Sequence, residues 1–115
     1  MTLKRVVITG LGAVTPIGNT IPEFWDSVIN GKSGAAPITN FDTETILTKT
    51  KFACEVKNFD LSLYMDRKEA RKVDKYAHFA IGAAVQAIED ASIDKEKENL
   101  DRIGVVLGVG LGGVE

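Results

Sequence analysis

The predicted fold depends most on residues 5–12, which read RVVITGLG. The three β-branched residues at 6–8 show no polar alternation, which is typical of a central strand covered on both faces, most often in a parallel sheet. Gly10 and Gly12 follow, and glycine lets the backbone turn sharply. We therefore predict a buried strand at residues 6–8 that ends in a glycine turn.

A second stretch of the same kind lies near the other end of the sequence. Residues 103–107 read IGVVL and run into the glycine-rich residues 108–113. Five of the 11 glycines fall in the last twelve residues, and a domain seldom ends inside a glycine turn directly after a core strand. We expect an α/β unit in which a right-handed crossover joins the two strands. We also expect this chain to be the front part of a longer protein.

Between these strands, residues 21–29 show the pattern of a helix with one buried face. Thr20 and Glu23 have the spacing of a capping box, and a proline lies in the first turn, where its missing N–H costs little. Apolar side chains recur at intervals of three and four residues, at Ile21, Phe24, Trp25, Val28 and Ile29. The Asn-Gly pair at residues 30–31 predicts the end of this helix.

The middle of the sequence predicts a long surface excursion over residues 32–63. Within it, residues 52–56 are expected to form a short strand. Asp66 and Glu69 then give a second capping signal. Residues 77–91 are rich in alanine and apolar nearly all round, which is typical of a buried helix whose small side chains let neighbouring backbones come close.

A basic stretch precedes this alanine-rich helix. Its cations recur at spacings of three and four residues, so that on a single helix they would line one side, at Lys68, Arg71, Lys72 and Lys75. Such a stripe is either a solvated face or a docking surface that attracts an acidic protein partner. The spacing alone leaves both interpretations open.

The composition excludes several classes of function. The chain has 115 residues, of which 44% are apolar and 26% charged, and this fits one soluble globular domain. A net charge of −2 argues against a nucleic-acid partner. One cysteine and one histidine exclude a disulfide framework and a multi-cysteine zinc site, and they favour a reducing, cytoplasmic setting. The longest uncharged apolar run, residues 103–114, is shorter than the roughly 20 residues of a membrane span.

Three residue patterns suggest chemistry. Gly108, Gly110 and Gly113 fit the dinucleotide-binding pattern, in which glycines let a pyrophosphate approach a helix N-terminus, although a plain glycine turn explains them as well. Cys54 follows an alanine and precedes a glutamate, and that carboxylate opposes the thiolate that a nucleophile needs. We therefore predict Cys54 to be a small buried side chain, and His78 to be a hydrogen-bonded or partly exposed histidine rather than a catalytic one.

Six segments of the sequence occur together in a fixed order. They are RVVITGLGAVTPIGN at 5–19, FW at 24–25, GKSG at 31–34, FD at 41–42, RKEARKVD at 67–74 and RIGVVLGVGLGG at 102–113. In this order they resemble the β-ketoacyl-[acyl carrier protein] synthases, and within that family the type II condensing enzymes of bacterial fatty acid elongation. The resemblance implies a thiolase-like αβαβα sandwich of two similar halves. Residues 1–115 would then be the first part of the N-terminal half.

The resemblance also implies an activity. Enzymes of this family are acyltransferases that load an acyl chain onto a cysteine, decarboxylate malonyl-carrier protein and join the resulting carbanion to the acyl group. Two histidines assist the decarboxylation, and backbone N–H groups hold the oxyanion. The family's cysteine and histidines match no residue of this chain, so neither Cys54 nor His78 is expected to be catalytic and these 115 residues alone are expected to be inactive. The family further implies a cytoplasmic homodimer without cofactor or metal, whose partner is acyl carrier protein bearing acyl and malonyl thioesters.

Two features carry over residue by residue. Lys68, Arg71 and Lys72 match the family's basic patch that meets the acidic carrier protein. Leu111 matches a bulky aliphatic residue at the acyl pocket, where a larger side chain would narrow the tunnel. Two alternatives stay open: a nucleotide-binding oxidoreductase domain that uses the glycines of residues 108–113, and a non-catalytic scaffold that binds a carrier. A fatty acid and a polyketide pathway are not distinguished.

Overall fold

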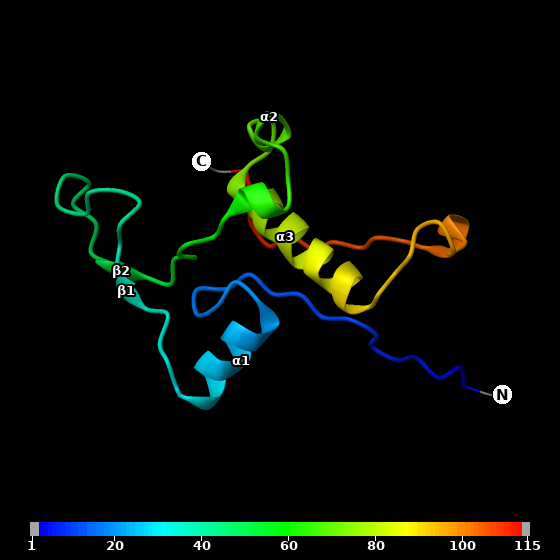
Figure 1. Cartoon of the computed structure of the whole chain (residues 1–115). Coiled ribbons are helices and arrows are strands. Elements are labelled where there is room, and N and C mark those ends of the chain that lie inside the picture. The colour runs from blue at the N-terminus through cyan, green and yellow to red at the C-terminus, as the bar shows by residue number, and fades with distance from the viewer. Residues whose placement is uncertain (1–2, 114–115) are drawn as a thin grey trace. The chain divides into compact units, whose positions relative to one another are not determined.

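The chain folds into two compact units, seen in a computed structural model that describes residues 3–113 (Figure 1). One unit combines the beginning of the chain, up to Gly12, with everything from Leu61 onward. The other consists of Ala13–Asp60. The backbone therefore leaves the first unit after Gly12 and returns to it at Leu61, so that residues far apart in the sequence share one unit.

In the unit of Ala13–Asp60, helix α1 spans Ile21–Ile29. The predicted N-cap is confirmed, because the backbone N–H of Glu23 donates to Thr20 Oγ1 at 3.4 Å. The return bond of the capping box is shifted by one residue: Glu23 Oε2 accepts the N–H of Asn19, and not that of Thr20, at 2.8 Å. These two contacts satisfy donors that have no partner within the helix. The helix ends at Asn30, and Gly31 follows with φ +62°, the left-handed conformation in which glycine costs least.

The predicted burial of one face of α1 is wrong for most of the stripe. Trp25 is 60% exposed, and Val28 and Ile29 are exposed with it. The buried residue of α1 is Ser27, whose hydroxyl donates to the carbonyl oxygen of Ile17 at 2.7 Å. The amphipathic pattern sets where the helix forms, but a face is buried only when another layer lies against it.

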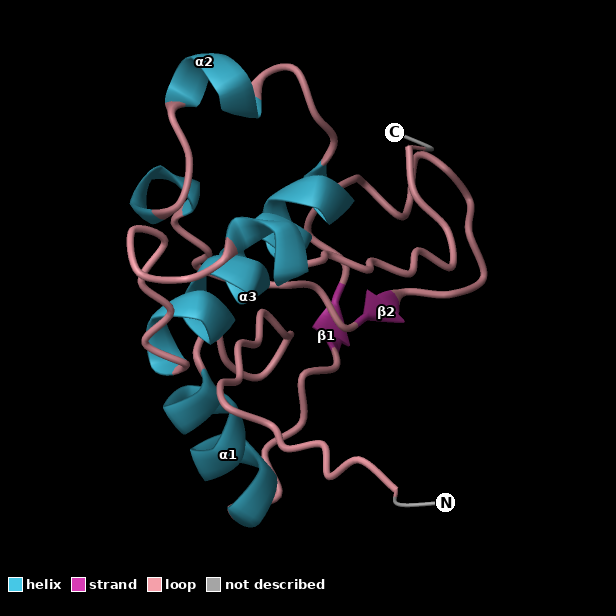
Figure 2. Ribbon diagram, turned by 90° about the vertical axis from the view of Figure 1, so that its right-hand side faces the viewer, coloured by secondary structure: helices cyan, strands magenta, loops and turns pink. Residues whose placement is uncertain are grey.

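The same unit holds a small antiparallel hairpin, drawn in magenta in Figure 2. Strand β1 (Ala36–Pro37) pairs with β2 (Phe52–Ala53), with Ala36 opposite Ala53. The predicted strand at 52–56 is therefore present but shorter than expected. Cys54 lies just beyond the paired residues and is exposed, so its predicted burial is wrong.

The side chain of Glu55 forms hydrogen bonds with the start of the long loop between the two strands. Glu55 accepts the hydroxyl of Thr39 at 2.7 Å and the backbone N–H groups of Thr39 and Asn40 at 3.1–3.2 Å. The hydrogen bond from the Thr39 hydroxyl is the main reason that the pKa of Glu55 lies below its ordinary value of 4.5, and the Asn40 and Thr39 amides and the Lys57 cation act in the same direction. The charged form of Glu55 is thus the one that holds the loop.

In the other unit, a short helix and a long helix follow one another. Helix α2 spans Arg67–Ala70, and Asp66 Oδ1 caps it by accepting the N–H of Lys68 at 2.9 Å, as the capping signal predicts. Helix α3 spans Lys75–Asp90. Two single-turn 3₁₀ helices, Leu61–Leu63 and Leu100–Arg102, lie on either side of this pair in the sequence.

Helix α3 is half-buried rather than enclosed. Its buried residue is Gly82, and most residues from 77 to 87 are partly covered. The beginning of the chain passes close to it: a side-chain Cβ on Gly12 would overlap the backbone of Ala83, and one on Gly10 would overlap the backbone of Ala87. Leu11 N, between these glycines, donates to Asp90 Oδ2 at 2.9 Å. The predicted close approach of backbones is confirmed, with glycines and alanines facing each other.

The prediction of two buried strands is wrong for the described residues. Residues 6–8 and 103–107 form no strand, and they are exposed, with Val6 at 89% and Val106 at 96%. A strand exists only when its N–H and C=O groups meet those of a neighbour, and within residues 3–113 neither stretch has such a ladder. The predicted central sheet is consequently absent from the described chain, and no described apolar side chain is fully buried.

Replacing Gly12 by alanine tests the packing of the glycines on α3. The new methyl group would meet the backbone of Ala83 and Ala87, which cannot move aside as a side-chain tip can. We expect Gly12→Ala to lower the free energy of unfolding by about 1–3 kcal/mol, the usual cost of overpacking, measured by thermal or urea denaturation. Gly104→Ala is the matched control, because a Cβ there meets no described atom within 4 Å. Equal stability of both variants would contradict the close approach.

The loop carboxylate predicts a pH dependence. Because folding lowers the pKa of Glu55, the stabilisation is present above the unfolded pKa and is lost as the pH falls through the lower folded pKa. We expect Glu55→Gln to flatten this part of the stability profile, measured by thermal unfolding between neutral pH and about pH 3. Glu98→Gln, at an exposed glutamate, serves as the control and should leave the profile unchanged.

Candidate functional site

The basic segment, residues 66–75, does not form the single helix that its spacing predicts. Helix α2 ends at Ala70, because the N–H of Lys72 turns back to the carbonyl of Glu69 at 2.9 Å. Asp74 is extended, with φ −79° and ψ 166°, and serves as the N-cap of α3. Lys75 then begins a new helix. The prediction of one continuous helical stripe is therefore wrong. An extended residue between two helices changes the chain direction, so the side chains before and after it do not share one helix face.

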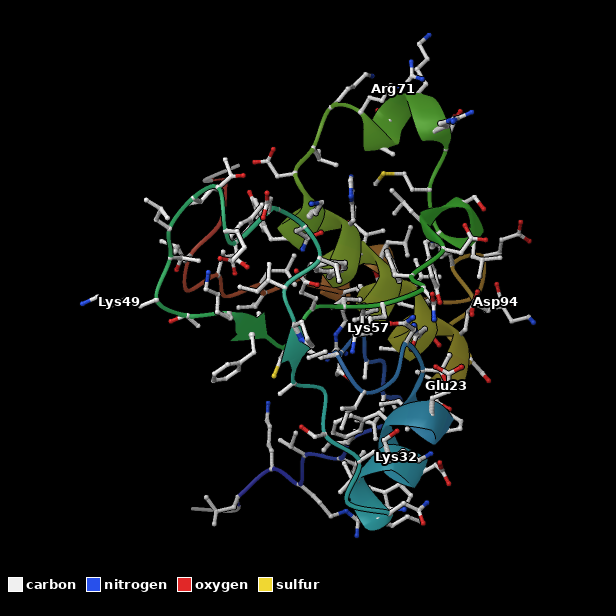
Figure 3. The ribbon with its side chains drawn as sticks, turned by 90° about the vertical axis from the view of Figure 1, so that its left-hand side faces the viewer. Glu23, Lys32, Lys49, Lys57, Arg71 and Asp94 are labelled. Carbon is white, nitrogen blue, oxygen red and sulfur yellow. The ribbon has the colours of Figure 1, made fainter. Side chains whose placement is uncertain are left out.

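The basic segment is nevertheless exposed and positively charged. It carries five cations and three carboxylates, whereas the whole chain has a net charge of −2. Lys72 Nζ contacts Glu69 Oε1 at 2.6 Å, an exposed pair that contributes little to stability. Lys68 and Arg71 form no side-chain ion pair with any residue of 3–113, and Arg71 extends from the end of the short helix in Figure 3. Lys68 and Arg71 therefore remain available to an anionic partner.

A side-chain hydrogen bond holds each end of α2. At its beginning, Asp66 provides the cap described above. At its end, the ring nitrogen Nε2 of His78 lies 2.9 Å from the carbonyl oxygen of Ala70. His78 is half-buried in the first turns of α3. It is thus a hydrogen-bonded, partly exposed histidine, as predicted.

The predicted acyl-pocket residue lies in the same unit. Leu111 is 84% exposed, in a bend between glycines. A Cβ on Gly112 would meet the ring of Tyr76 at 2.8 Å, and one on Gly113, which has φ +69°, would meet Asp74 Oδ2 at 3.1 Å. The glycines therefore let the bend lie against the beginning of α3, where the basic segment ends. The structure brings the predicted docking and pocket residues to the same end of one helix.

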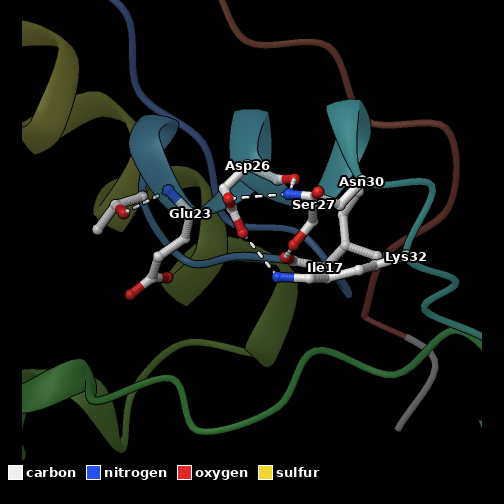
Figure 4. A network of polar contacts seen from close by, with 7 residues as sticks. Ile17, Glu23, Asp26, Ser27, Asn30 and Lys32 are labelled. Atoms are coloured by element: carbon white, nitrogen blue, oxygen red, sulfur yellow. Dashed lines mark hydrogen bonds and ion pairs between the residues drawn. The ribbon is translucent and has the colours of Figure 1, made fainter.

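A polar cavity that the sequence did not suggest lies in the unit of Ala13–Asp60. Its volume is about 460 Å³, and it lies between residues 15–19, the polar side of α1, residues 32–33 and residues 57–58. Figure 4 shows the network at its wall: Lys32 Nζ contacts Asp26 Oδ2 at 2.6 Å, and Asn30 Nδ2 donates to Asp26 Oδ1 at 3.0 Å. Asp26 and Lys32 thus pair with each other, and the signal in the sequence is the turn-forming TPIGN at residues 15–19.

Neither a metal centre nor a reactive thiol emerges from the described residues. No group of three or more His, Cys, Asp or Glu side chains in residues 3–113 is placed to hold a metal ion. Cys54 is exposed next to Glu55, whose carboxylate is engaged with the Thr39 loop. No described helix has the length and apolar character needed to cross a membrane.

The dinucleotide pattern lacks its structural context in the described chain. In that pattern a helix begins directly at the glycines and its N-terminus holds the pyrophosphate. Residues 103–113 contain no helix, and the stretch before the glycines is not a strand. The glycines at 112 and 113 are explained by their packing against Tyr76 and Asp74.

Comparison with known proteins identifies the family of this chain. Residues 3–115 match the family model described as beta-ketoacyl synthase, N-terminal domain. The chain therefore belongs to the β-ketoacyl synthase family, which confirms the resemblance read from the sequence.

Curated relatives agree over nearly the whole chain. The 3-oxoacyl-[acyl-carrier-protein] synthase 2 of Synechocystis sp. is 47% identical over 112 residues, which cover 97% of this chain and 26% of that protein. The protein of the same name from Vibrio cholerae is 44% identical over 115 residues, which cover 100% of this chain and 27% of that protein. The chain thus spans about a quarter of the length of these relatives.

Two solved structures resemble the fold. The ishigamide ketosynthase/chain length factor aligns with a TM-score of 0.70 and 32% identity, over 78% of this chain and 22% of that one. The second is a type II polyketide synthase acyl carrier protein in complex with its ketosynthase bound to the hexaketide, with a TM-score of 0.59 and 25% identity, over 84% of this chain and 24% of that one. The chain accordingly has a ketosynthase-like, and thus thiolase-like, fold.

Proposed function

We propose that this chain is part of a 3-oxoacyl-[acyl-carrier-protein] synthase, which condenses an acyl group with malonyl-carrier protein in fatty acid synthesis. The observation that carries the proposal is the 44–47% identity, over 97–100% of the chain, to proteins of that name. In the proposed reaction a cysteine thiolate outside these 115 residues takes the acyl group from its carrier. Loss of CO2 from the malonyl thioester gives a carbanion, which attacks the acyl group and releases the thiolate.

The direct test is product formation by the intact protein. Incubation with acyl-carrier protein and malonyl-carrier protein should release CO2 and give 3-oxoacyl-carrier protein, detected by mass spectrometry. The alternative of a non-catalytic scaffold predicts carrier binding without product. The alternative of a nucleotide-binding oxidoreductase domain predicts stabilisation by NAD or NADP in a thermal-shift assay.

Within this reaction we assign the basic segment to carrier docking. Lys68 and Arg71 are exposed and form no ion pair with a described residue, and Lys72 lies beside them in its exposed pair with Glu69. A locally positive surface on a chain of net charge −2 attracts an acidic partner and orients it. The structural relative solved with its acyl carrier protein supports a carrier as that partner.

Charge reversal tests the docking assignment. We expect the double variant Lys68→Glu, Arg71→Glu to raise the KM for acyl-carrier protein about tenfold at low salt, because steering by exposed charges acts mainly on association and is screened by added salt. The kcat should change little, and steady-state kinetics at two salt concentrations separate the parameters. Lys49→Glu is the matched control at an exposed lysine of the other unit. An unchanged KM in the double variant would refute the assignment.

We also assign Leu111 to the wall of the acyl pocket. Its exposure leaves the side chain free to face an acyl chain, and Gly112 and Gly113, which follow it, pack against the beginning of α3. Leu111→Phe is expected to reduce kcat/KM for long acyl chains relative to short ones by about 10- to 200-fold, the effect of a small change of volume in such a pocket. Leu111→Met, of similar volume, is the control. A parallel change for all chain lengths would contradict the assignment.

The remaining features of the proposal concern architecture. We place residues 1–115 in the first part of the N-terminal half of an αβαβα sandwich. The ketosynthase-like fold supports this placement. The family relationship further supports a cytoplasmic homodimer that uses acyl and malonyl thioesters of the carrier.

A further inference from the structure

The hydrogen bond between His78 and Ala70 joins the two helices that frame the basic segment. Ala70 is the last residue of α2, and His78 lies in the first turns of α3. The two atoms, His78 Nε2 and Ala70 O, are 2.9 Å apart. Because a carbonyl oxygen only accepts, Nε2 must carry the hydrogen and donate it. The contact therefore fixes which ring nitrogen is protonated.

The bond acts on the peptide that carries a docking cation. The carbonyl of Ala70 belongs to the same peptide unit as the N–H of Arg71, whose side chain extends into solvent. The last carbonyls of a helix have no partner within it, and a helix of four residues has little stability of its own. Asp66 caps the beginning of α2 locally, and His78, which belongs to α3, holds its end.

We infer that His78 is a positioning residue for the carrier-docking surface. Its side chain holds the end of α2, so that Lys68 and Arg71 are presented in one arrangement before the partner arrives. Without this hydrogen bond, part of the binding free energy is spent on ordering the segment. His78 itself stays half-buried beneath the surface and acts through the two cations. The inference rests on the proposed docking function of the basic segment.

Two conservative variants of the intact protein test the inference. The side-chain amide of glutamine can reach Ala70 O, whereas that of asparagine is one methylene shorter and falls short. We expect His78→Asn to raise the KM for acyl-carrier protein about three- to tenfold, the effect of one lost hydrogen bond, with kcat unchanged. We expect His78→Gln to restore most of the wild-type KM. Both variants should keep wild-type kinetics with a carrier-free acyl thioester, such as an acyl N-acetylcysteamine.

A double-mutant cycle distinguishes this inference from the docking assignment. In the background of Arg71→Ala, the change from His78 to Asn should have a smaller effect, because the cation that it positions is gone. If Lys68→Glu, Arg71→Glu leaves KM unchanged, the docking assignment fails and the inference fails with it. If that double variant raises KM but His78→Asn does not, the inference alone is overturned. If His78→Asn lowers kcat/KM equally for carrier-bound and carrier-free substrates, His78 has a merely structural role and the inference is also overturned.

Discussion

The close approach of Gly10 and Gly12 to α3 is the constraint on which the larger unit depends. It brings residues from the beginning of the chain against Ala83 and Ala87, more than 70 positions later, with no room for a Cβ. The hydrogen bond from Leu11 to Asp90 fixes the position of the segment along the helix. Because the backbones touch directly, a substitution at either glycine displaces the chain rather than a side chain.

The residues proposed to meet the carrier and the acyl chain lie near the opposite, N-terminal end of the same helix. There α3 begins at Asp74, the glycine bend that carries Leu111 lies against Tyr76, and His78 reaches back to the end of α2. One helix thus links the glycine packing to the residues that we assign to the carrier and to the acyl chain. This arrangement explains why the helix combines small residues along its length with a histidine and an aromatic ring in its first turns.

Local signals in the sequence predicted local structure well. The caps at Thr20 and Asp66, the end of α1 and the small-residue packing on α3 all depend on neighbours within a few residues or on the absence of a side chain. The strands and the burial of α1 were wrong for the described residues because they require a partner layer. The spacing of the basic residues identified the charged segment but did not predict that the helix is interrupted at Asp74. Spacing alone does not show where one helix ends and the N-cap of the next begins.

The exposed stretch at residues 103–107 has a consequence for handling the protein. Its backbone N–H and C=O groups lack a ladder in the described chain, and its side chains are β-branched or aliphatic with no charge among them. Such an exposed, uncharged segment of high β-propensity pairs readily with the same segment of another molecule. Solutions concentrated enough for two copies to meet will therefore favour intermolecular β-sheet, and the colloidal behaviour of the polypeptide will depend on whether these five residues are covered.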